Sequence, residues 1–441
     1  MRALNAGIRL LLAAALLLGT TVGCSAGGPG DDHCAPFAAY RAKTETTVRI
    51  SSVVRGAEED SLVKAWEKFE DCTRIDIQYT GSERFEAELE QQVRGGAGPD
   101  MALFPQPGLL ARLARAGLVR PATAQVRANV EKWFPADWQR YGTVDGTLYA
   151  APYDAHVKSL VWYSPKLFRE KGWAVPATWG EMLALSDRIA AAGIKPWCAG
   201  IESGSATGWP ATDWLEDVLL RTAGAQVYDR WMAHTIPFDD PRVVAALDRV
   251  GGILRNPAYV NGGHGGVRSI ATTTVPEAGL PIMERHCAMY RMSSFYQRAW
   301  PATAQLAEDG DVWAFYLPPV DPARGRPVLG AGNFVGVFND RPEVAMLAAY
   351  LSTPQFANTL AASRAGISAN RGLDHDGLPD PISKLFAQLI TDPSVTFRFD
   401  ASDLMPAQVG TGTFWTGMTD WINGADTATV LHRIEKSWPR S

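Results

Sequence analysis

The sequence predicts an α/β protein whose chain builds two lobes and passes between them more than once. Three observations indicate this fold class. Strand and helix patterns alternate from Thr47 to Ala116, as in a doubly wound parallel sheet. Mainly helical patterns follow, and apolar strands return only near Val312, far along the chain. The length of 441 residues is sufficient for two domains of ordinary size.

The first residues have the pattern of an export signal. Arg2 and Arg9 flank an apolar run at 10–18 that is too short to span a bilayer as a helix. Small residues then lead to Cys24 in a pattern that resembles the lipobox of bacterial lipoproteins, although Thr21 replaces the usual aliphatic residue. The resemblance predicts a signal peptide at 1–23, a diacylated Cys24, a flexible lipidated tether at 24–45, and attachment to the outer face of the cell membrane.

The remaining cysteines fit an oxidising compartment. If lipid occupies Cys24, four cysteines are left, an even number. We expect Cys34 to pair with Cys72 and Cys198 with Cys287, although the sequence alone permits three connectivities. The chain has no CxxC motif and no histidine pair at helical ligand spacing, so no metal site is expected.

Composition limits the class of partner. The formal net charge is -5, and acidic and basic residues are interspersed rather than gathered into a basic stripe. Nucleic acid is therefore not an expected partner, whereas small neutral ligands remain open.

The alternating region predicts three strand–helix units. The strands lie at 47–54, 74–81 and 99–105, and the helices at 58–71, 83–94 and 109–116. Ligands of such sheets bind beyond the carboxyl ends of the strands. Ser82 and Glu83 after the second strand, and Gln106 after the third, are therefore expected to lie in one crevice, with Glu58 and Asp60 near its edge.

The later elements divide the chain between the lobes. The aromatic stretch 145–164, broken by Pro152, is expected to cross between them, and Ser164 and Pro165 begin a helix. Further helices are expected after the capping box of Thr178 and Glu181 and after Asp240. Strands at 312–320 and 334–338 and helices at 343–351, 355–362 and 382–390 complete the pattern. We assign 46–150 and 312–353 to lobe 1, and 151–311 and 354–441 to lobe 2.

The stretch 201–217 has the composition of a sugar-binding surface. Trp209 and Trp214 offer flat apolar faces, and Glu202 and Asp213 offer carboxylate acceptors. A pyranose needs both, because its axial hydrogens form an apolar face and its hydroxyls surround the edge. The alternative is a buried turn before an ordinary helix, with the tryptophans in the core and Asp213 as a helix cap.

Four stretches together resemble a known family. They are DGTLYAAPYDAHVKSLVWYSP at 145–165, CAGIESGSATGWPATDW at 198–214, FRFDASDLMP at 397–406 and GTFWTGMTDW at 412–421. With the lipobox, they look like the α-glucoside-type solute-binding proteins of bacterial ABC transporters, within the family 1 extracellular sugar binders. The resemblance covers nearly the whole mature chain. It implies a two-lobed periplasmic-binding-protein-like fold of type II, with hinge strands joining two doubly wound lobes that close on a sugar for delivery to a membrane permease.

Within this resemblance we expect a monomer that needs no cofactor and is not an enzyme. The stacking candidates are Tyr153, Trp209, Phe295 and Trp415, and Arg398 is expected to donate a hydrogen bond or to pair with Asp400 or Asp403. Asn333, in a glycine-rich run, allows backbone to approach a ligand, and Lys158 is expected to be an ion-pair partner. The full expected ligand-binding set is Ser82, Glu83, Gln106, Tyr153, Asp154, Glu202, Trp209, Asp213, Phe295, Asn333, Arg398, Asp400, Asp403 and Trp415.

Two other functions fit parts of the pattern. Paired carboxylates beside aromatic residues also occur in glycoside hydrolases, but their separation cannot be obtained from the sequence. A binder of peptides or phosphate is disfavoured, because neutral aromatic surfaces outnumber cationic clusters in the candidate loops. The sequence has neither a Walker loop nor a GxSxG motif.

Overall fold

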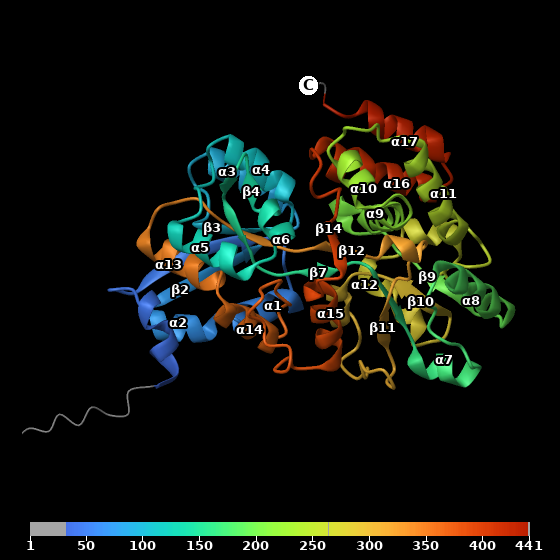
Figure 1. Cartoon of the computed structure of the whole chain (residues 1–441), viewed down its shortest axis with the longest axis horizontal. Helices are drawn as coiled ribbons and strands as arrows, with labels where there is room; N and C mark the ends of the chain where they lie inside the picture. The colour runs from blue at the N-terminus through green and yellow to red at the C-terminus, as the bar shows by residue number, and fades with distance from the viewer. Residues whose placement is uncertain (1–31, 263, 440–441) are drawn as a thin grey trace, which may run out of the picture.

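A computed structural model describes residues 32–262 and 264–439, which form two lobes side by side with strands between them (Figure 1). The expected signal peptide, Cys24 and the first part of the tether lie outside the described residues. No helix in the described ranges is long and apolar enough to cross a membrane.

Lobe 1 is built on a five-stranded sheet with the order β2-β1-β3-β13-β6. Its strands are β1 (Thr46–Ser52), β2 (Ile75–Gly81), β3 (Met101–Phe104), β6 (Ala150–Pro152) and β13 (Phe334–Val337). β1 pairs in parallel with β2 and β3, whereas β13 runs antiparallel to β3 and β6. The expected parallel start of the sheet is confirmed, and β13 is the returning strand.

Helices cover both faces of this sheet (Figure 1). They are α1 (Ala57–Lys64), α2 (Glu67–Thr73), α3 (Phe85–Arg94), α4 (Pro107–Arg115), α5 (Ala124–Trp133), α6 (Ala136–Tyr141), α13 (Pro342–Leu351) and α14 (Pro354–Ala362). The single helix expected at 58–71 is two helices, because fully buried Ala65 and Trp66 form a turn between α1 and α2. We expected α14 in lobe 2, but its Phe356 packs 5.5 Å from Tyr350 of α13 and 5.0 Å from Tyr153.

Lobe 2 has a four-stranded sheet with the order β11-β8-β10-β9. The strands are β8 (Leu160–Tyr163), β9 (Lys195–Cys198), β10 (Cys287–Arg291) and β11 (Trp313–Tyr316). β10 is parallel to β9 and antiparallel to β8. We expected the strand near Trp313 in lobe 1, but β11 pairs with β8 in lobe 2, so the chain returns to lobe 1 only at β13.

The helices of lobe 2 surround this sheet, and several begin with predicted caps. They are α7 (Pro165–Lys171), α8 (Trp179–Ala191), α9 (Trp209–Ala223), α10 (Ala225–Met232), α11 (Pro241–Leu254), α12 (Val275–Ala278), α15 (Pro381–Thr391), α16 (Trp415–Ile422) and α17 (Thr427–Lys436). The side chains of Ser164, Thr178 and Asp240 accept hydrogen bonds from the first turns of α7, α8 and α11, as expected.

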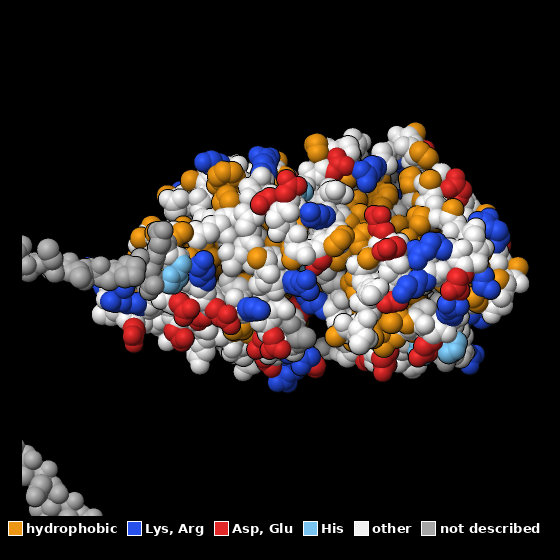
Figure 2. All heavy atoms as spheres, turned by 90° about the horizontal axis from the view of Figure 1, so that it is seen from below, with side chains coloured by type: hydrophobic (Ala, Val, Ile, Leu, Met, Phe, Trp, Pro, Cys, Tyr) orange, Lys and Arg blue, Asp and Glu red, His pale blue; other side chains and the backbone are white. Residues whose placement is uncertain are grey.

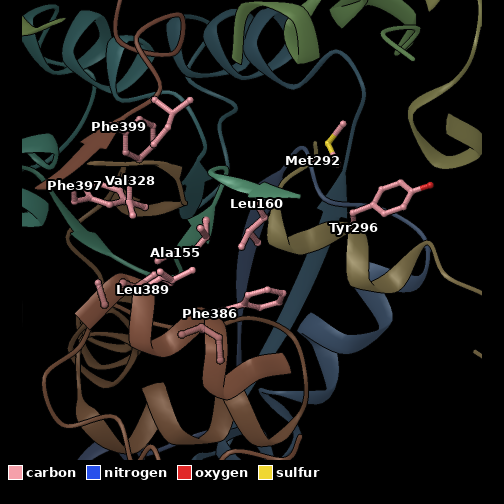
Figure 3. Packing of buried hydrophobic residues seen from close by; sticks show 14 of the residues in the cluster. Ala155, Leu160, Met292, Tyr296, Val328, Phe386, Leu389, Phe397 and Phe399 are labelled. Atoms are coloured by element: carbon pink, nitrogen blue, oxygen red, sulfur yellow. The ribbon is translucent and has the colours of Figure 1, made fainter. Parts of the chain in front are cut away.

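A three-stranded sheet joins the lobes. It contains β7 (His156–Val157), β12 (Arg326–Ala331) and β14 (Val395–Phe399), in the order β14-β12-β7. β7 follows β6 of lobe 1, and β12 leads into β13, so two connections pass through this hinge sheet. Figure 3 shows apolar side chains packed around it, including Val328 of β12 beside its register partner Phe397 of β14.

Both expected disulfides are confirmed. Cys34 is bonded to Cys72 at the end of α2, and Cys198 of β9 is bonded to Cys287 of β10. The first disulfide links the N-terminal segment to lobe 1, and the second links neighbouring strands of lobe 2. Charged side chains of both signs are mixed over the face shown in Figure 2, in agreement with the interspersed charges of the sequence.

Candidate functional site

The ends of strands from both lobes face one another across a cleft. A pocket of about 540 Å³ lies there. Lobe 1 lines it with Val53, Arg55 and Glu83, which follow β1 and β2, and lobe 2 lines it with residues 202–206, Thr274 and Pro276. The pocket therefore brings together Glu83 and Glu202, two of the expected binding residues, at the mouth of the cleft.

The polar groups at this mouth have partners within their own lobes. Glu83 forms an ion pair with Arg55. The side chain of Glu83 is 66% exposed and that of Arg55 is 49% exposed. Ser82 donates a 2.6 Å hydrogen bond to Glu88, and Glu202 accepts a 2.8 Å hydrogen bond from the amide of Gly204. These side chains are held in place at the rim rather than inside the cleft.

An aromatic wall on lobe 2 contains Trp209, Phe295 and His156. The rings of Trp209 and Phe295 are 5.9 Å apart, and His156 meets Phe295 edge to face at 5.8 Å. All three side chains are partly exposed. The ammonium group of Lys158 lies 5.1 Å from the centre of the Trp209 ring. The indole of Trp209 therefore has a cation and an aromatic ring as neighbours and is still partly exposed.

The position of Trp209 depends on a close backbone approach. Gly208 precedes α9 with φ of +113°, and a Cβ there would lie 2.1 Å from the carbonyl oxygen of Trp415. Only glycine fits this contact. Trp415 is partly exposed, and its indole Nε1 is buried with no hydrogen-bond partner among the described residues. The start of α16 is thus packed against the start of α9.

Polar atoms without partners lie where lobe 1 meets lobe 2. The buried Oε1 of Gln106 has no hydrogen-bond partner within the described ranges. Close by in sequence, the amide of Gly108 in α4 donates a 3.0 Å hydrogen bond to the carbonyl oxygen of Asp403 on lobe 2. The carboxyl group of Asp403 is half-buried, and burial and the charge of Asp400 raise its pKa well above the usual value.

A second contact joins the lobes on the other side of the aromatic wall. Arg298, which follows Phe295, donates a 2.9 Å hydrogen bond to Glu58 of α1 and also binds the carbonyl oxygen of Ala365. Glu58 was expected near the crevice edge, and the structure confirms that it faces lobe 2. Together with Gly108 and Asp403, this ion pair holds the two lobes in contact.

The expected residues of the hinge are buried. Tyr153 is 1% exposed and packs against Phe356, and its hydroxyl has no hydrogen-bond partner in the described part of the chain. The carboxylate of Asp154 accepts hydrogen bonds of 2.7 Å from the amide and 2.9 Å from the side chain of Asn333. This pair fixes the two crossing strands to each other, which is a hinge role.

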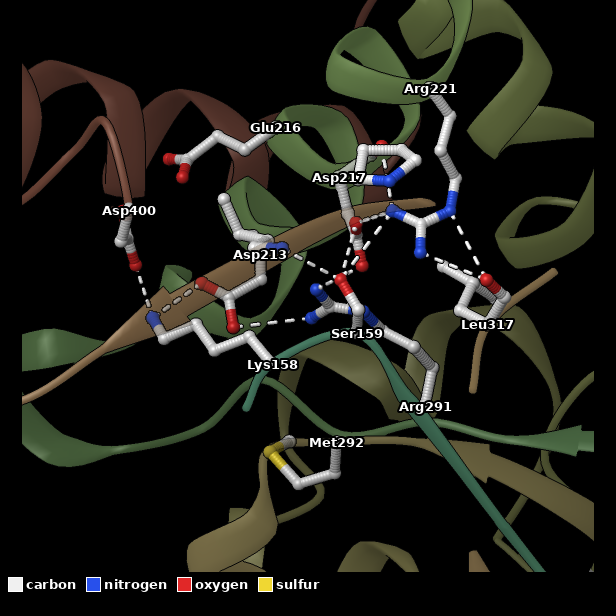
Figure 4. A network of polar contacts seen from close by, with 12 residues as sticks. Lys158, Ser159, Asp213, Glu216, Asp217, Arg221, Arg291, Met292, Leu317 and Asp400 are labelled. Carbon is white, nitrogen blue, oxygen red and sulfur yellow. Dashed lines mark hydrogen bonds and ion pairs between the residues drawn. The ribbon is translucent and has the colours of Figure 1, made fainter. Parts of the chain in front are cut away.

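A buried charge network surrounds helix α9 and Lys158 (Figure 4). Helix α9 supplies Asp213, Glu216 and Asp217 from one face. Asp217 accepts hydrogen bonds from Ser159 at 2.9 Å and Arg291 at 3.0 Å and forms an ion pair with Arg221. All of these charged side chains are at most 2% exposed.

Lys158 connects this network to the end of β14. Its ammonium group lies 2.8 Å from Asp213 and forms a hydrogen-bonded ion pair with Asp400. Asp213 also binds Arg291 at 3.1 Å, and Asp400 accepts hydrogen bonds from the amide and hydroxyl of Ser402. The expected ion-pair role of Lys158 is confirmed. Asp213 and Asp400 are not placed as ligand acceptors, because their oxygens face internal donors.

Glu216 differs from the other acids of the network. It accepts hydrogen bonds from the amides of Ala401 at 2.9 Å and Ser402 at 3.1 Å, and no cation pairs with it among the described residues. Its pKa is raised well above the usual value, first by burial and then by the charge of Asp400. Burial and the charge of Asp400 thus both favour the protonated form of Glu216.

The pKa directions of its neighbours agree with that assignment. Burial alone would raise the pKa of Asp400, but Lys158 and hydrogen bonds from its neighbours outweigh burial and lower it. Burial would likewise lower the pKa of Lys158, and Asp213 and Asp400 raise it instead. Burial raises the pKa of Asp213 to about 7 against the opposing charge of Lys158.

The same three acids have the spacing of metal ligands, but a lysine fills the place of the ion. One oxygen each from Asp213, Glu216 and Asp400 lies within 4.8 Å of the others. The ammonium group of Lys158 contacts two of them. The ammonium group of Lys158 would repel a metal ion at this place, so the cluster is a salt-bridge network.

The expected role of Arg398 is wrong. Its guanidinium group binds Asp229 of α10 with hydrogen bonds of 2.7 and 2.9 Å, not Asp400 or Asp403. Asp229 is itself only half-buried, so this ion pair lies toward the surface and away from the buried Asp400. Asp213 is not a helix cap either, since α9 begins at Trp209 and places Asp213 inside the helix.

Sequence reasoning missed several members of the network and the wall. They are Ser159, Glu216, Asp217, Arg221 and Arg291 in the network and His156 in the wall. A signal for two of them was present: Asp213, Glu216 and Asp217 have the spacing of one helical face within an otherwise apolar helix. Charges on a buried face need partners, and their identities depend on strands far away in sequence.

Comparisons with known proteins agree with this geometry. The family model described as bacterial extracellular solute-binding protein matches residues 51–355. The osmoprotective compounds-binding protein GgtB of Synechocystis is 42% identical over 89% of this chain and 92% of its own length. The alpha-glucosides-binding periplasmic protein AglE of Rhizobium meliloti is 38% identical over 89% of this chain and 87% of its own.

Solved structures show the same two-lobed fold at low sequence identity. The bacterial solute receptor AcbH is 18% identical with a TM-score of 0.74, over 89% of this chain and 98% of its own. Maltose-bound MalE3 of T. maritima is 17% identical with a TM-score of 0.68, over 88% and 98%. The expected type II fold is confirmed, and the relatives are binding components of transporters and not enzymes. The chain belongs to the bacterial extracellular solute-binding protein family.

Proposed function

We propose that the protein captures a small glucoside in the cleft between its lobes and delivers it to the permease of an ABC importer. The observation that carries this proposal is the partly exposed aromatic pair of Trp209 and Phe295 on lobe 2, together with the half-buried acid Asp403 and the unpartnered oxygen of Gln106 at the junction of the lobes. Aromatic faces and carboxylate or amide oxygens are the two kinds of group that a pyranose requires.

The pocket at the mouth supports a ligand larger than one ring. Its volume of about 540 Å³ is within the range of small-molecule sites, and it continues from the segment that ends at Trp209. Glu83, Glu202 and Arg55 give this region acceptors and one donor for hydroxyl groups. The names of the two relatives, one for alpha-glucosides and one for osmoprotective compounds, support a glucoside with a small polar second group.

The binding step uses closure of the lobes. A ligand that contacts both walls favours the closed state, because only that state offers both sets of contacts. In this proposal Gln106 and the mouth residues of lobe 1 bind one side of the sugar, and Trp209, Phe295 and Asp403 of lobe 2 bind the other. Asp154 and Asn333 hold the crossing strands together during this movement.

We further propose that the protein acts as a monomer anchored by lipid on Cys24 outside the cell membrane. The lipobox-like sequence supports the anchor, and the Cys34–Cys72 disulfide would link the tether firmly to lobe 1. Two acyl chains are needed for stable attachment. Intact mass of the protein from membranes should show them, and the Cys24→Ser variant should be released without them.

Calorimetry against a panel of disaccharides tests the proposed function. Maltose, trehalose, sucrose, isomaltulose and a glucoside of a small polyol form the panel, with cellobiose and lactose as controls. We expect one site per chain, a preference for α-glucosides and no product after prolonged incubation. Failure of every panel member to bind, or preference for the control sugars, would contradict the proposal, and product formation would favour a glycoside hydrolase.

A further inference from the structure

We infer that Lys158 is a positioning residue for the binding wall: its ammonium group fixes the Trp209 ring and the segment 400–403 relative to helix α9. The effect of Lys158 on sugar binding rests on the proposed function, whereas its effect on the position of Trp209 does not. Lys158 itself touches no part of the cleft pocket, and its side chain is 6% exposed. Its effect on binding would therefore pass through its neighbours.

Lys158 and its contacts come from three separate parts of the chain. Lys158 follows the hinge strand β7, Asp213 lies inside α9, and Asp400 follows the hinge strand β14. The third contact is with Trp209, the first residue of α9, at 5.1 Å. A single cation thus joins the hinge, the wall and the strand that leads to Asp403 (Figure 4).

Fold stability alone is a weak explanation for this arrangement. Replacing a buried ion pair with apolar groups of similar volume is often neutral or stabilising. Without Lys158, Asp213 retains Arg291, and Asp400 retains the amide and hydroxyl of Ser402. The network therefore has other donors for both acids, whereas the Trp209 ring has only this cation within contact distance in the described structure.

The segment beyond Asp400 reaches the junction of the lobes. Asp403 lies three residues after Asp400, and its carbonyl oxygen accepts the hydrogen bond of Gly108 from lobe 1. A shift of Asp400 would move this acceptor as well as the Asp403 carboxyl group. Lys158 is therefore placed to affect both the stacking surface and the closing contact.

A charge-balanced double variant separates positioning from stability. Lys158→Met with Asp400→Asn removes one positive and one negative charge, so no buried charge is left without its pair. The matched control is Lys166→Met with Asp311→Asn, which removes a 2.7 Å ion pair on the surface of lobe 2. We expect the double variant to melt within a few degrees of wild type and to bind the best panel sugar on the order of tenfold more weakly. The control should bind as wild type does.

A readout without ligand tests the contact with Trp209 directly. Acrylamide quenches tryptophan fluorescence. The contribution of Trp209 is the difference in fluorescence between each protein and the same protein carrying Trp209→Phe. We expect stronger quenching of Trp209 in the double variant than in wild type or the control, because the ring loses its cation neighbour and keeps only the ring contact with Phe295 among the described residues. The single variant Lys158→Arg keeps the positive charge, so it should retain most of the sugar affinity and the weak Trp209 quenching of wild type.

The outcomes distinguish this inference from the proposed function. Unchanged Trp209 quenching in a folded double variant overturns the inference, whatever the sugar result. Affinity within twofold of wild type overturns it as well, and failure of the double variant to fold assigns Lys158 to stability instead. If wild type binds no panel sugar but quenching changes as expected, the proposed function fails and the positioning of Trp209 stands.

Discussion

The amide of Gly108 on lobe 1 and the carbonyl oxygen of Asp403 on lobe 2 form a 3.0 Å hydrogen bond across the cleft. A Cβ at position 108 would lie 3.0 Å from the carbonyl oxygens of both Asp403 and Met405. The start of α4 can therefore approach lobe 2 this closely only because residue 108 has no side chain. This contact defines how far the lobes close.

Gly108→Ala should weaken ligand binding without reducing stability. The methyl group would push the two carbonyl oxygens away and favour the open state, so we expect roughly fivefold to tenfold weaker binding. Alanine also suits a helix better than glycine does, so the melting temperature should not fall. Gly180→Ala in α8, where a Cβ meets open space, is the control. Small-angle scattering that shows equal closure with ligand in Gly108→Ala and wild type would contradict this role.

Trp209→Ala should remove a major part of the binding energy. If the indole ring stacks on the sugar, removal of the ring should cost on the order of 2 kcal/mol of binding free energy, about a thirtyfold change in Kd. The fold should survive, because Trp209 is partly exposed. The control is Trp173→Ala, a partly buried tryptophan of lobe 2 that packs against Phe168. Equal sugar affinity in Trp209→Ala and wild type would remove Trp209 from the site.

Asp403→Ala should weaken binding more than the adjacent surface change Gln408→Ala. A buried acceptor that binds a sugar hydroxyl contributes about 1 to 3 kcal/mol. Asp403 has no side-chain partner in the described ranges, so its removal leaves no internal donor unpaired. Calorimetry gives the affinities, and thermal denaturation checks folding. A large loss of stability with unchanged affinity would assign Asp403 to the fold.

Much of lobe 1 could be predicted from the sequence because its signals are local. Strand–helix alternation up to Ala116 fixes the elements, and the order of a parallel sheet then places Glu83 and Gln106 near one edge. Which of the two sheets a later strand joins depends on residues far away in sequence. Trp313 begins an apolar strand in either lobe, and only its pairing with Tyr163 of β8 assigns it to lobe 2.

The binding residues were harder to predict than the fold. An aspartate in an aromatic segment serves equally well as a sugar acceptor or as a salt-bridge partner. Asp213 and Asp400 are partners of Lys158, and that fact depends on three segments far apart in sequence. Trp209 and Phe295, two of the four predicted stacking residues, lie beside each other in the structure, and their use by a ligand is still a prediction.

Loss of the Cys198–Cys287 disulfide should destabilise lobe 2. The bond closes 89 residues of chain, and loop-closure entropy predicts a stabilisation of roughly 4 to 5 kcal/mol. Cys198→Ala with Cys287→Ala should therefore lower the melting temperature clearly. The control pair is Cys34→Ala with Cys72→Ala, which should affect lobe 1 and leave the wall of lobe 2 in place. If hydrogen exchange in β9 and β10 of the Cys198→Ala, Cys287→Ala variant is as slow as in wild type or slower, the prediction is contradicted.

Glu216→Gln should become increasingly more stable than wild type as the pH rises. Four buried acids, Asp213, Glu216, Asp217 and Asp400, face three buried cations, Lys158, Arg221 and Arg291. Glu216 is the acid without a cation, and burial raises its pKa in the folded protein. The hydroxyl of Tyr228 lies between two acceptors, at 2.9 Å from the carbonyl oxygen of Phe399 and at 3.3 Å from the carboxyl group of Glu216.

The sign follows from the two states of Glu216. In the unfolded chain it ionises near pH 4.3, about its usual value, whereas the folded protein retains the proton until the raised pKa is reached. Its contribution is therefore fully present below about pH 4 and is lost as the pH rises, at a slope of about 1.4 kcal/mol per pH unit. Asp213, with a pKa raised to about 7, changes stability in the same direction.

A pH series of melting temperatures measures this effect. Glutamine keeps the shape of neutral Glu216 and can donate to Asp400, so Glu216→Gln should match wild type near pH 4 and exceed it progressively toward pH 8. Glu131→Gln, an exposed position on α5, should show a constant difference from wild type over the same range. A constant difference for Glu216→Gln as well would mean that Glu216 is ionised in the folded protein, and that another acid of the network holds the proton.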